Sequence, residues 1–392
     1  MVEPHRGGTH LAKRLTRTAI VTASVSMFIL AACGSDDKAS DSTSAPAATD
    51  ASATTGAPDT TAAAPESTEA PDTTQSPDTT AAAAGIACAA TEGATIGYSE
   101  PLPDPNFALI EDVLRLELDK AGATLIPVNA NLDPAKQIAD VNTLLAEKVD
   151  VLLINPVDPN AVQGVLADVR TANIPIVVQD TKAGGPYFTN VTADVEAAAA
   201  AGAKLLKETV GDGNVTAVIG PPFAEVIVRE TDTFAATAAE VGLNVVETQT
   251  NGDISPDTAR GLTQAWKQQY GADLAGIWTF NDTSAVGVAA AFDAGFKPVL
   301  VSINGQPEAI PLVKDGTILA TFDLQTEMLG RALAYAAIAA ICGETVPEDI
   351  WVESKLIDAS NVDQWVNPAE RGKKDVSVVL EERDGKTYLV EG

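Results

Sequence analysis

The residues that could do chemistry in this chain are carboxylates and amides that stand directly after apolar runs. Asn155 follows the run VDVLLI, and Asp180 follows the run at residues 174–179. Each run is too short for a helix and is typical of a strand that is buried on both faces. Ligands of α/β proteins bind at the turns after such strands. Asn155 and Asp180 are therefore candidate ligand contacts, although Asn155 taken alone could simply cap its turn.

The elements that would position these residues follow a repeating order. The spacing of Ile138, Val141 and Leu144 predicts an amphipathic helix over residues 134–147, with Asp133 as its N-cap. Helix, buried strand, polar turn and helix make a βαβ pattern. Apolar runs and helical stretches alternate in this way from residue 94 to about residue 322. The alternation predicts a doubly wound parallel α/β architecture.

Histidine chemistry is excluded by where the two histidines stand. His5 and His10 both precede residue 33, in a segment predicted below to be removed. The mature chain then has no Ser-His-Asp or Cys-His catalysis and no histidine metal ligand. The sequence also has no Walker-type loop, G-x-G-x-x-G or G-x-S-x-G motif. We expect no cofactor and no metal, whereas carboxylate chemistry remains open.

Residues 1–32 are predicted to be a signal peptide. Four basic residues precede an apolar core of 14 residues, 19–32, which is short for a membrane span. The segment ends Leu-Ala-Ala and is followed by Cys33, which resembles a bacterial lipoprotein cleavage box. We therefore expect Cys33 to be lipidated and to anchor the protein outside the cytoplasm. The alternative is an ordinary secretory signal followed by a chance cysteine.

Residues 33–91 are predicted to be a disordered tether after the lipidated cysteine. From residue 34 to 85 the chain is mostly Ala, Thr, Ser, Pro and Asp, lacks aromatic residues and repeats PDTT three times. Such a segment cannot bury enough apolar surface to offset its ordering entropy. As a flexible coil it would span about 40 Å. That length suits a tether which lifts a domain off a membrane.

The charge of the chain argues against one class of partner. Loss of the signal region, with four basic residues and one acidic residue, takes the formal net charge from −29 to −32. So acidic a chain is repelled by phosphate backbones, and no basic stripe is present in the sequence. We expect no nucleic-acid partner.

The order of these turns resembles the ribose-binding-like periplasmic sugar receptors, which are type I solute-binding proteins of ABC importers. The resemblance runs from about residue 94 to 366 and includes INPVD at residues 154–158. It implies two similar parallel-sheet lobes joined by a three-strand hinge, with the ligand in the cleft between them. It places crossovers near residues 193–194, 323–324 and 349.

The resemblance also implies domain borders. The first lobe would hold residues 92–193 and 324–349, and the second 194–323 and 350–366. Residues 367–392 exceed what the family needs and form a C-terminal extension. Its strand-like SVVLEE and its DGK turn suggest an added hairpin.

The family positions supply a candidate set of ligand contacts. A sugar offers hydroxyls that donate and accept, so its site needs carboxylates, amides and an aromatic against the ring. Each buried polar group left unpaired costs about 1–3 kcal/mol. The matching positions in this chain are Asp104, Asn106, Phe107, Asn155, Asp180, Thr181, Arg229, Phe280, Asn281, Asn304, Asp323 and Gln325.

The sequence departs from the family at several of these positions. Asn106 replaces an aromatic, and Thr181 replaces an arginine that follows the aspartate matched by Asp180. Arg229 stands one residue out of register with a second family arginine, so Lys182 or Arg229 could compensate. Because this chain has fewer cationic and aromatic residues at these positions than the family, a neutral monosaccharide or polyol is the ligand that fits best.

Three further positions lie in the second half of the chain. The resemblance implies that Asn281 faces the ligand and that Asp282 caps the next helix, although the two roles could be exchanged. Asn304 stands where the family has an aspartate, and Asp323 and Gln325 stand where it keeps a glutamine.

Two other functions remain open from the sequence. A receptor of the same fold could present its ligand to a chemoreceptor or a sensor kinase instead of an ABC permease. A sugar hydrolase could use two carboxylates at a defined spacing, such as Asp180 and Asp323. A repressor of this fold is excluded because the chain carries an export signal and lacks DNA-binding helices. We expect a monomer that delivers its ligand to a permease.

The two cysteines that remain after lipidation are Cys88 and Cys342. Free thiols are unusual in an oxidising compartment. In the resembled family both segments belong to the same lobe, which makes a disulfide more plausible than two separate thiols. Such a bridge would fix the end of the tether at the edge of that lobe.

Overall fold

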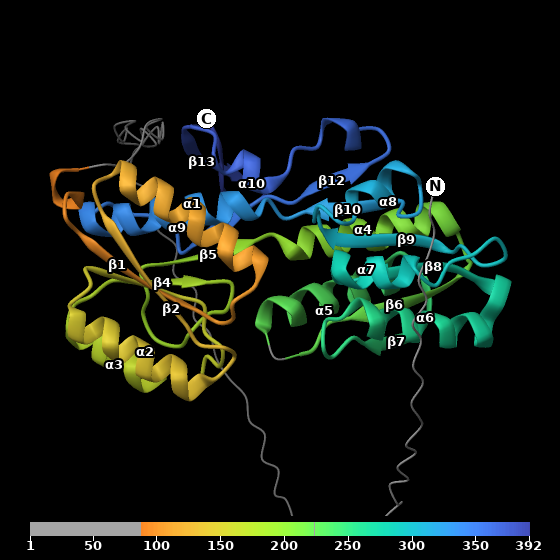
Figure 1. The fold of residues 1–392 in the computed structure, drawn as a ribbon, viewed down its shortest axis with the longest axis horizontal. Coiled ribbons are helices and arrows are strands. Elements are labelled where there is room, and N and C mark those ends of the chain that lie inside the picture. Colours follow the sequence, from red (N-terminus) through yellow and green to blue (C-terminus); the bar gives the residue numbers. More distant parts are fainter. Residues whose placement is uncertain (1–87, 223) are drawn as a thin grey trace, which may run out of the picture. The chain divides into compact units, whose positions relative to one another are not determined.

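The alternation of apolar runs and helical stretches builds two α/β lobes, each around its own sheet (Figure 1). The computed structural model describes residues 88–222 and 224–392. The predicted signal peptide, Cys33 and most of the predicted tether lie outside the described residues. The predicted α/β class with two doubly wound lobes is confirmed by the two sheets.

The first sheet has eight strands within the described residues, in the order β13-β14-β11-β5-β4-β3-β1-β2. Neighbouring strands are parallel except for the antiparallel pair of β13 and β14. The strands are β1 Thr95–Glu100, β2 Thr124–Asn129, β3 Val151–Ile154, β4 Ile176–Gln179, β5 Thr189–Ala193, β11 Asp349–Val352, β13 Val378–Arg383 and β14 Lys386–Glu391.

Helices cover both faces of this sheet because the strand residues are apolar on both sides. Val151 and Leu153 of β3 pack in one cluster with α1 (Pro105–Lys120) and α9 (Thr326–Cys342). The alternate residues Leu152 and Ile154 pack with α2 (Pro134–Glu147) and α3 (Gln163–Thr171). Successive strand residues point to opposite faces, so β3 is buried twice, as its continuous apolar run predicts. No helix within the described ranges is long and apolar enough to cross a membrane.

The second sheet has six strands in the described part of the chain, in the order β12-β10-β9-β8-β6-β7. All neighbours are parallel except β10 and β12. Its strands are β6 Asn214–Ile219, β7 Asn244–Thr250, β8 Leu274–Thr279, β9 Val299–Asn304, β10 Ala320–Asp323 and β12 Lys355–Asp358.

This sheet is also covered on both faces. Trp278 of β8 packs with α4 (Val195–Val210) and α5 (Glu225–Glu240), and its ring stacks on Phe234 at 4.1 Å between centroids. The adjacent residue Ile277 belongs to a second apolar cluster, which it forms with the helices on the other face of the sheet. These helices are α6 Pro256–Tyr270, α7 Asp282–Ala289 and α8 Ile310–Lys314.

In the described chain three crossovers join the two lobes in turn, and a fourth connection, residues 359–377, leads from β12 of the second sheet back to β13 of the first. The first crossover follows β5, where Asp194 caps α4, and the second joins β10 to α9. The third joins β11 to β12 through residues 353–354. The predicted border at 349/350 is too early, because β11 pairs with β5 of the first sheet through residue 352. A four-residue strand carries no local mark of the sheet that it joins, so its sequence could not reveal this.

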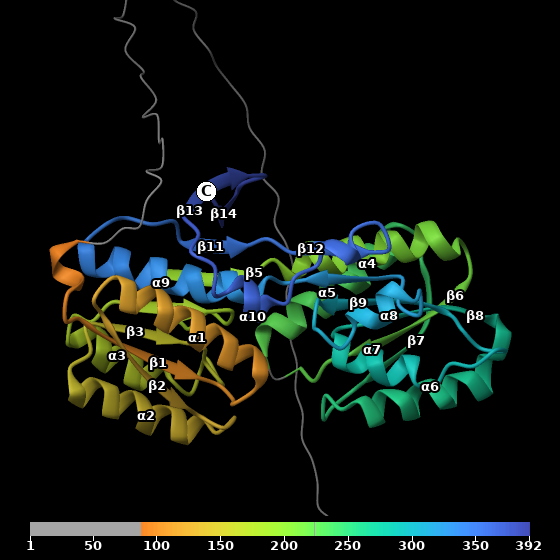
Figure 2. The ribbon, with the colours of Figure 1, turned by 45° about the horizontal axis from the view of Figure 1, so that its top comes forward.

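The C-terminal extension, residues 367–392, adds to the first sheet. It forms α10 (Pro368–Arg371) and the antiparallel hairpin of β13 and β14. Tyr388 of β14 pairs with Trp351 of β11, so the hairpin continues the sheet beyond β11 (Figure 2).

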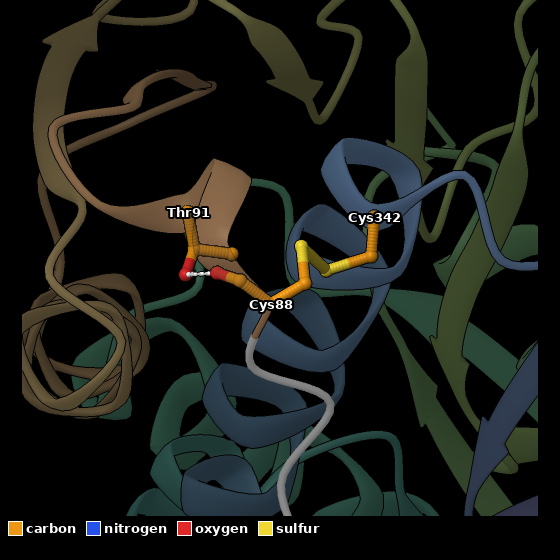
Figure 3. The surroundings of a disulfide bond; sticks show 3 residues. All are labelled: Cys88, Thr91 and Cys342. Atoms are coloured by element: carbon orange, nitrogen blue, oxygen red, sulfur yellow. Dashed lines mark hydrogen bonds between the residues drawn. A yellow bond between two sulfur atoms is a disulfide. The ribbon is translucent and has the colours of Figure 1, made fainter.

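A disulfide joins Cys88 to Cys342, with 5.9 Å between the two Cα atoms (Figure 3). Cys88 precedes the short 3-10 helix η1 (Ala89–Thr91), and Cys342 is the last residue of α9. The Thr91 hydroxyl donates to the Cys88 carbonyl oxygen at 2.7 Å. The bridge therefore fastens the start of the described chain to a helix that covers the first sheet.

Candidate functional site

The expected site residues stand at the carboxyl ends of strands from both sheets. In the first sheet Asn155 follows β3 and Asp180 follows β4. In the second, Asn281 follows β8, while Asn304 and Asp323 end β9 and β10. The carboxyl edge of a parallel sheet is where α/β proteins bind ligands.

Asp180 is the centre of a polar cluster in the first lobe. Its Oδ2 accepts from Asn155 Nδ2 at 3.3 Å and from Gln179 Nε2 at 3.1 Å, and its Oδ1 accepts from the Thr192 hydroxyl at 3.1 Å. Its backbone has a φ of 59°, in the left-handed region that aspartate tolerates better than most residues. The structure therefore brings Asn155 and Asp180 together, as their turns predict.

Residues that the sequence analysis did not select hold this cluster in place. The Tyr98 hydroxyl donates to Gln179 Oε1 at 2.7 Å, which orients the amide that Gln179 presents to Asp180. Gln137 of α2 donates to the Asn155 carbonyl oxygen at 2.9 Å and accepts from the backbone of Val157, so it fixes the turn after β3. A signal was available, because each of these side chains is a polar residue within an apolar pattern.

Arg229 of α5 is the cation that reaches Asp180. Its Nη2 donates to the Asp180 carbonyl oxygen at 3.3 Å and to the Thr192 hydroxyl at 3.1 Å. Its Nη1 donates to Glu196 of α4 at 3.0 Å. Lys182, the other candidate, is exposed and pairs with Asp349 at 2.9 Å. Of the two compensating cations considered, the structure thus brings Arg229 and not Lys182 to the cluster.

The electrostatics of the cluster favour hydroxyl groups. Burial raises the pKa of Asp180, while the Arg229 guanidinium acts in the opposite direction. Three side chains donate hydrogen bonds to the Asp180 carboxylate, and the Ala193 backbone is a further donor to it. A carboxylate has about four acceptor positions, so a ligand hydroxyl would bind Asp180 by sharing or displacing one of these donors. Asp180 and Glu196 together outweigh the charge of Arg229, which disfavours an anionic ligand.

Three candidates of the first lobe, two at the start of α1 and one after β4, are engaged within the protein itself. Asp104 caps the helix, because its Oδ1 accepts from the backbone nitrogens of Asn106 at 2.7 Å and Phe107 at 3.0 Å. The Phe107 side chain is partly buried against the apolar cluster of the first lobe. Thr181 is buried, with its backbone nitrogen donating to the Gln179 carbonyl oxygen at 2.6 Å.

Asn281, and not Asp282, takes the capping role, which is the alternative that the sequence left open. Asn281 is the N-cap of α7, because its Oδ1 accepts from the Ser284 backbone nitrogen at 2.8 Å. Asp282 does not cap the helix. It is fully buried and accepts from the Thr321 hydroxyl at 2.8 Å and from the Gln306 backbone nitrogen at 2.7 Å. The expectation that Asp282 caps α7 is wrong, because the helix begins at Asp282 and the residue before it, Asn281, takes the cap position.

Three further candidates are engaged away from the Asp180 cluster. Phe280 is 4% exposed and packs in the core of the second lobe. Asp323 is fully buried, and both of its oxygens accept from the Arg371 guanidinium, at 2.7 and 3.1 Å. Gln325 donates to the Glu353 carbonyl oxygen at 2.6 Å.

The engagement of Asp323 bears on the hydrolase alternative. A general acid or nucleophile needs a carboxyl that can exchange protons or attack, and Asp323 is held by two charge-assisted hydrogen bonds. This argues against Asp180 and Asp323 as a catalytic pair.

Asn304 ends β9 with a φ of 117° and is followed by Gly305. Within residues 88–222 and 224–392, no group of three or more His, Cys, Asp or Glu side chains could hold a metal ion.

Residues 102–345 match the family described as periplasmic binding protein domain. The ribose import binding protein of Bacillus subtilis is 30% identical over 267 residues, which cover 67% of this chain and 86% of that protein. The xylitol-binding protein of Mycolicibacterium smegmatis is 26% identical over 241 residues, 60% of this chain and 68% of that protein.

Solved structures have the same fold. An ABC transporter solute binding protein from Mycobacterium smegmatis with bound glycerol has a TM-score of 0.64 and 27% identity, covering 70% of this chain and 97% of its own. A solute binding protein from Bacillus halodurans with bound myo-inositol also has a TM-score of 0.64, at 22% identity, with the same coverage of both chains.

Proposed function

The chain belongs to the periplasmic binding protein domain family, and we propose that it captures a small neutral sugar or polyol and delivers it to an ABC importer. Relatives named for ribose, galactofuranose, fructose and xylitol support this ligand class. So do solved neighbours with glycerol and myo-inositol bound. These relatives are binding proteins, and the role proposed here is binding rather than catalysis.

The observation that carries the proposal is the environment of Asp180. A partly buried carboxylate whose side-chain donors are all neutral is suited to a neutral hydroxyl, which donates a charge-assisted hydrogen bond without adding charge. Asn155 and Arg229 lie within hydrogen-bond distance of Asp180 atoms and are the proposed partners for the oxygen atoms of the ligand. An acidic sugar would bring a further negative charge next to Asp180 and Glu196.

We also propose that the protein works outside the cytoplasm, as a monomer held to the membrane by a lipid on Cys33. The support is the signal-like segment, the Leu-Ala-Ala-Cys box and the tether composition of residues 34–85. The Cys33→Ala variant tests the anchor. It should be released from membranes into the soluble fraction, and retention at the membrane would contradict the lipid.

A thermal-shift screen of the full chain tests the ligand class. The probes are ribose, fructose, xylitol and myo-inositol, with galacturonate as the anionic comparison. A ligand present at 100 times its dissociation constant adds about 2.7 kcal/mol to the free energy of unfolding, which is a readily measured shift. Stabilisation by a neutral probe supports the proposal. Stabilisation by galacturonate alone would overturn it.

Incubation of the same protein with aryl glycosides separates binding from hydrolysis. We expect no release of the aryl group above that of the Asp180→Asn variant. Release that depends on Asp180 would make the protein an enzyme.

A further inference from the structure

Each of the three crossovers holds an acidic residue that accepts from a basic side chain of the C-terminal extension. The acidic residues are Asp194, Asp323 and Glu353, which lie at or next to the first, second and third crossovers. Their basic partners are Lys386, Arg371 and Arg383. One segment of 26 residues thus contacts all three of these crossovers.

The contact at the first crossover is buried. Asp194 is 1% exposed, and its Oδ1 accepts from Lys386 Nζ at 2.8 Å while its Oδ2 accepts from the Tyr388 hydroxyl at 2.6 Å. The same Oδ1 caps α4 of the second lobe by accepting from the Ala197 backbone nitrogen at 3.1 Å. Because Tyr388 belongs to β14, which pairs with β11, this aspartate joins the first sheet's edge to the second lobe's helix.

The contact at the second crossover is a buried ion triad. Arg371 binds Asp323 through two hydrogen bonds and Glu327 through its Nε at 2.8 Å. Asp323 ends β10 of the second sheet, and Glu327 lies in the first turn of α9 on the first lobe. One guanidinium therefore spans the residues on both sides of the crossover.

The third crossover is linked both to the extension and to the second crossover. Arg383 donates to the Glu353 carboxylate at 3.0 Å, and its guanidinium lies 4.8 Å from the centroid of the Tyr388 ring. The Glu353 carbonyl oxygen accepts from Gln325, the residue before α9. The view in Figure 2 shows β13 and β14 next to β11, on the path from the first sheet to β12.

From these contacts we propose that residues 367–392 act as a hinge clasp, which holds the three crossovers in one mutual arrangement and restrains rotation of the lobes. Domain closure is absorbed by φ and ψ changes of a few hinge residues. Hydrogen bonds and ion pairs between the hinge residues and one rigid hairpin limit these φ and ψ changes. The ligand is captured against this restraint if the proposed function holds, but the restraint itself is a property of the chain without ligand.

Single-molecule FRET on the full chain measures the restraint directly. Clickable amino acids at Thr143 of α2 and Gln264 of α6 carry the two dyes, because both positions are exposed and this labelling leaves the cysteines untouched. In the wild type we expect one narrow distribution of inter-dye distances without ligand. In the triple variant Arg371→Gln, Arg383→Gln, Lys386→Gln we expect at least a twofold wider distribution or a second population.

A matched control separates the clasp from a general effect of charge. Lys373→Gln with Lys374→Gln removes two positive charges from the same extension; Lys373 pairs with Glu370 of the extension itself and not with a crossover. Its distribution should equal that of the wild type. Equal widening in the control and the triple variant would overturn the proposal, as would an unchanged distribution in a folded triple variant.

A milder variant covers the case in which the triple variant does not fold. Arg383→Gln with Tyr388→Phe removes one hydrogen bond to Glu353, one to Asp194 and the guanidinium contact with the ring at position 388, but keeps the ring itself. It should still widen the distribution, and an unchanged width would count against the clasp. Because every measurement is made without ligand, a failed sugar screen would leave this test intact, and a failed clasp would leave the binding proposal intact.

Discussion

At the scale of single residues, Asp180 determines the ligand chemistry that we propose. The Asp180→Asn variant keeps a residue type that tolerates the φ of 59°, but it loses the charge and one acceptor atom. Binding of a probe found in the screen should weaken by about 3 kcal/mol, since hydrogen bonds to charged groups contribute about 1.5–3 kcal/mol each. Calorimetry measures the loss. The exposed Asp212→Asn is the matched control, and equal affinities of all three proteins would exclude Asp180 from the site.

Asp282 makes the stability of the second lobe depend on pH. Burial raises its pKa from 3.8 to about 7 in the folded chain. Between pH 4 and pH 7 the unfolded chain has lost this proton while the folded chain still holds it, so the free energy of unfolding falls as the pH rises. The stabilisation is complete below pH 4 and absent above pH 7.

The Asp282→Asn variant cannot titrate at this position. The wild type should therefore lose on the order of 4 kcal/mol more than the variant between pH 4 and pH 8 in urea unfolding. Burial also raises the pKa values of Glu100 and Glu327 to about 7, but both proteins share these groups, and their contribution cancels in the comparison. Parallel pH curves would refute the role of Asp282.

At the scale of elements, the turn after β9 depends on a glycine. Gly305 has a φ of 69°, and a Cβ atom there would lie 2.5 Å from the Cα of Asp323 at the end of β10. Thr321 of β10 also accepts from the Gly305 backbone nitrogen at 3.2 Å. The turn and the neighbouring strand therefore approach more closely than a side chain would allow.

Gly305→Ala should lower the free energy of unfolding by roughly 3 kcal/mol, from left-handed strain and from overpacking together. Gly316→Ala is the matched control, because its φ of 72° is similar but its Cβ would meet open space. It should lose only about 1 kcal/mol. Urea unfolding of the two variants isolates the close approach, and losses of equal size would show that it does not matter.

At the scale of the whole molecule, the disulfide between Cys88 and Cys342 closes a loop that holds most of the described chain. Cys88 and Cys342 are 254 residues apart, and on the chain-entropy model a bridge over such a loop contributes at most about 5 kcal/mol. Mass spectrometry of the unreduced, alkylated protein should find neither cysteine modified, and reduction before alkylation should modify both. The Cys88→Ser, Cys342→Ser variant should unfold at a lower urea concentration. Two alkylated cysteines in the unreduced protein would rule out the bridge in solution.

Local pattern in the sequence determined most elements of this fold. The helix predicted over residues 134–147 is α2, because its apolar spacing and its Asp133 cap are both local properties. The buried strands were equally visible, since a strand covered on both faces must be apolar at consecutive positions. Asp180 and Asn155 could be selected because the end of such a strand is also the edge at which the sheet binds ligands.

Only the tertiary structure decided the contacts between distant segments. Asp323 has the residue type and the strand-end position of a ligand contact, yet Arg371 occupies it from 48 residues further along the chain. Whether β11 joined the first or the second sheet depended on its pairing with β5, about 160 residues earlier. A carboxylate's partner and a strand's neighbour are set by the packing of the complete chain, and the residues beside them in the sequence do not record either one.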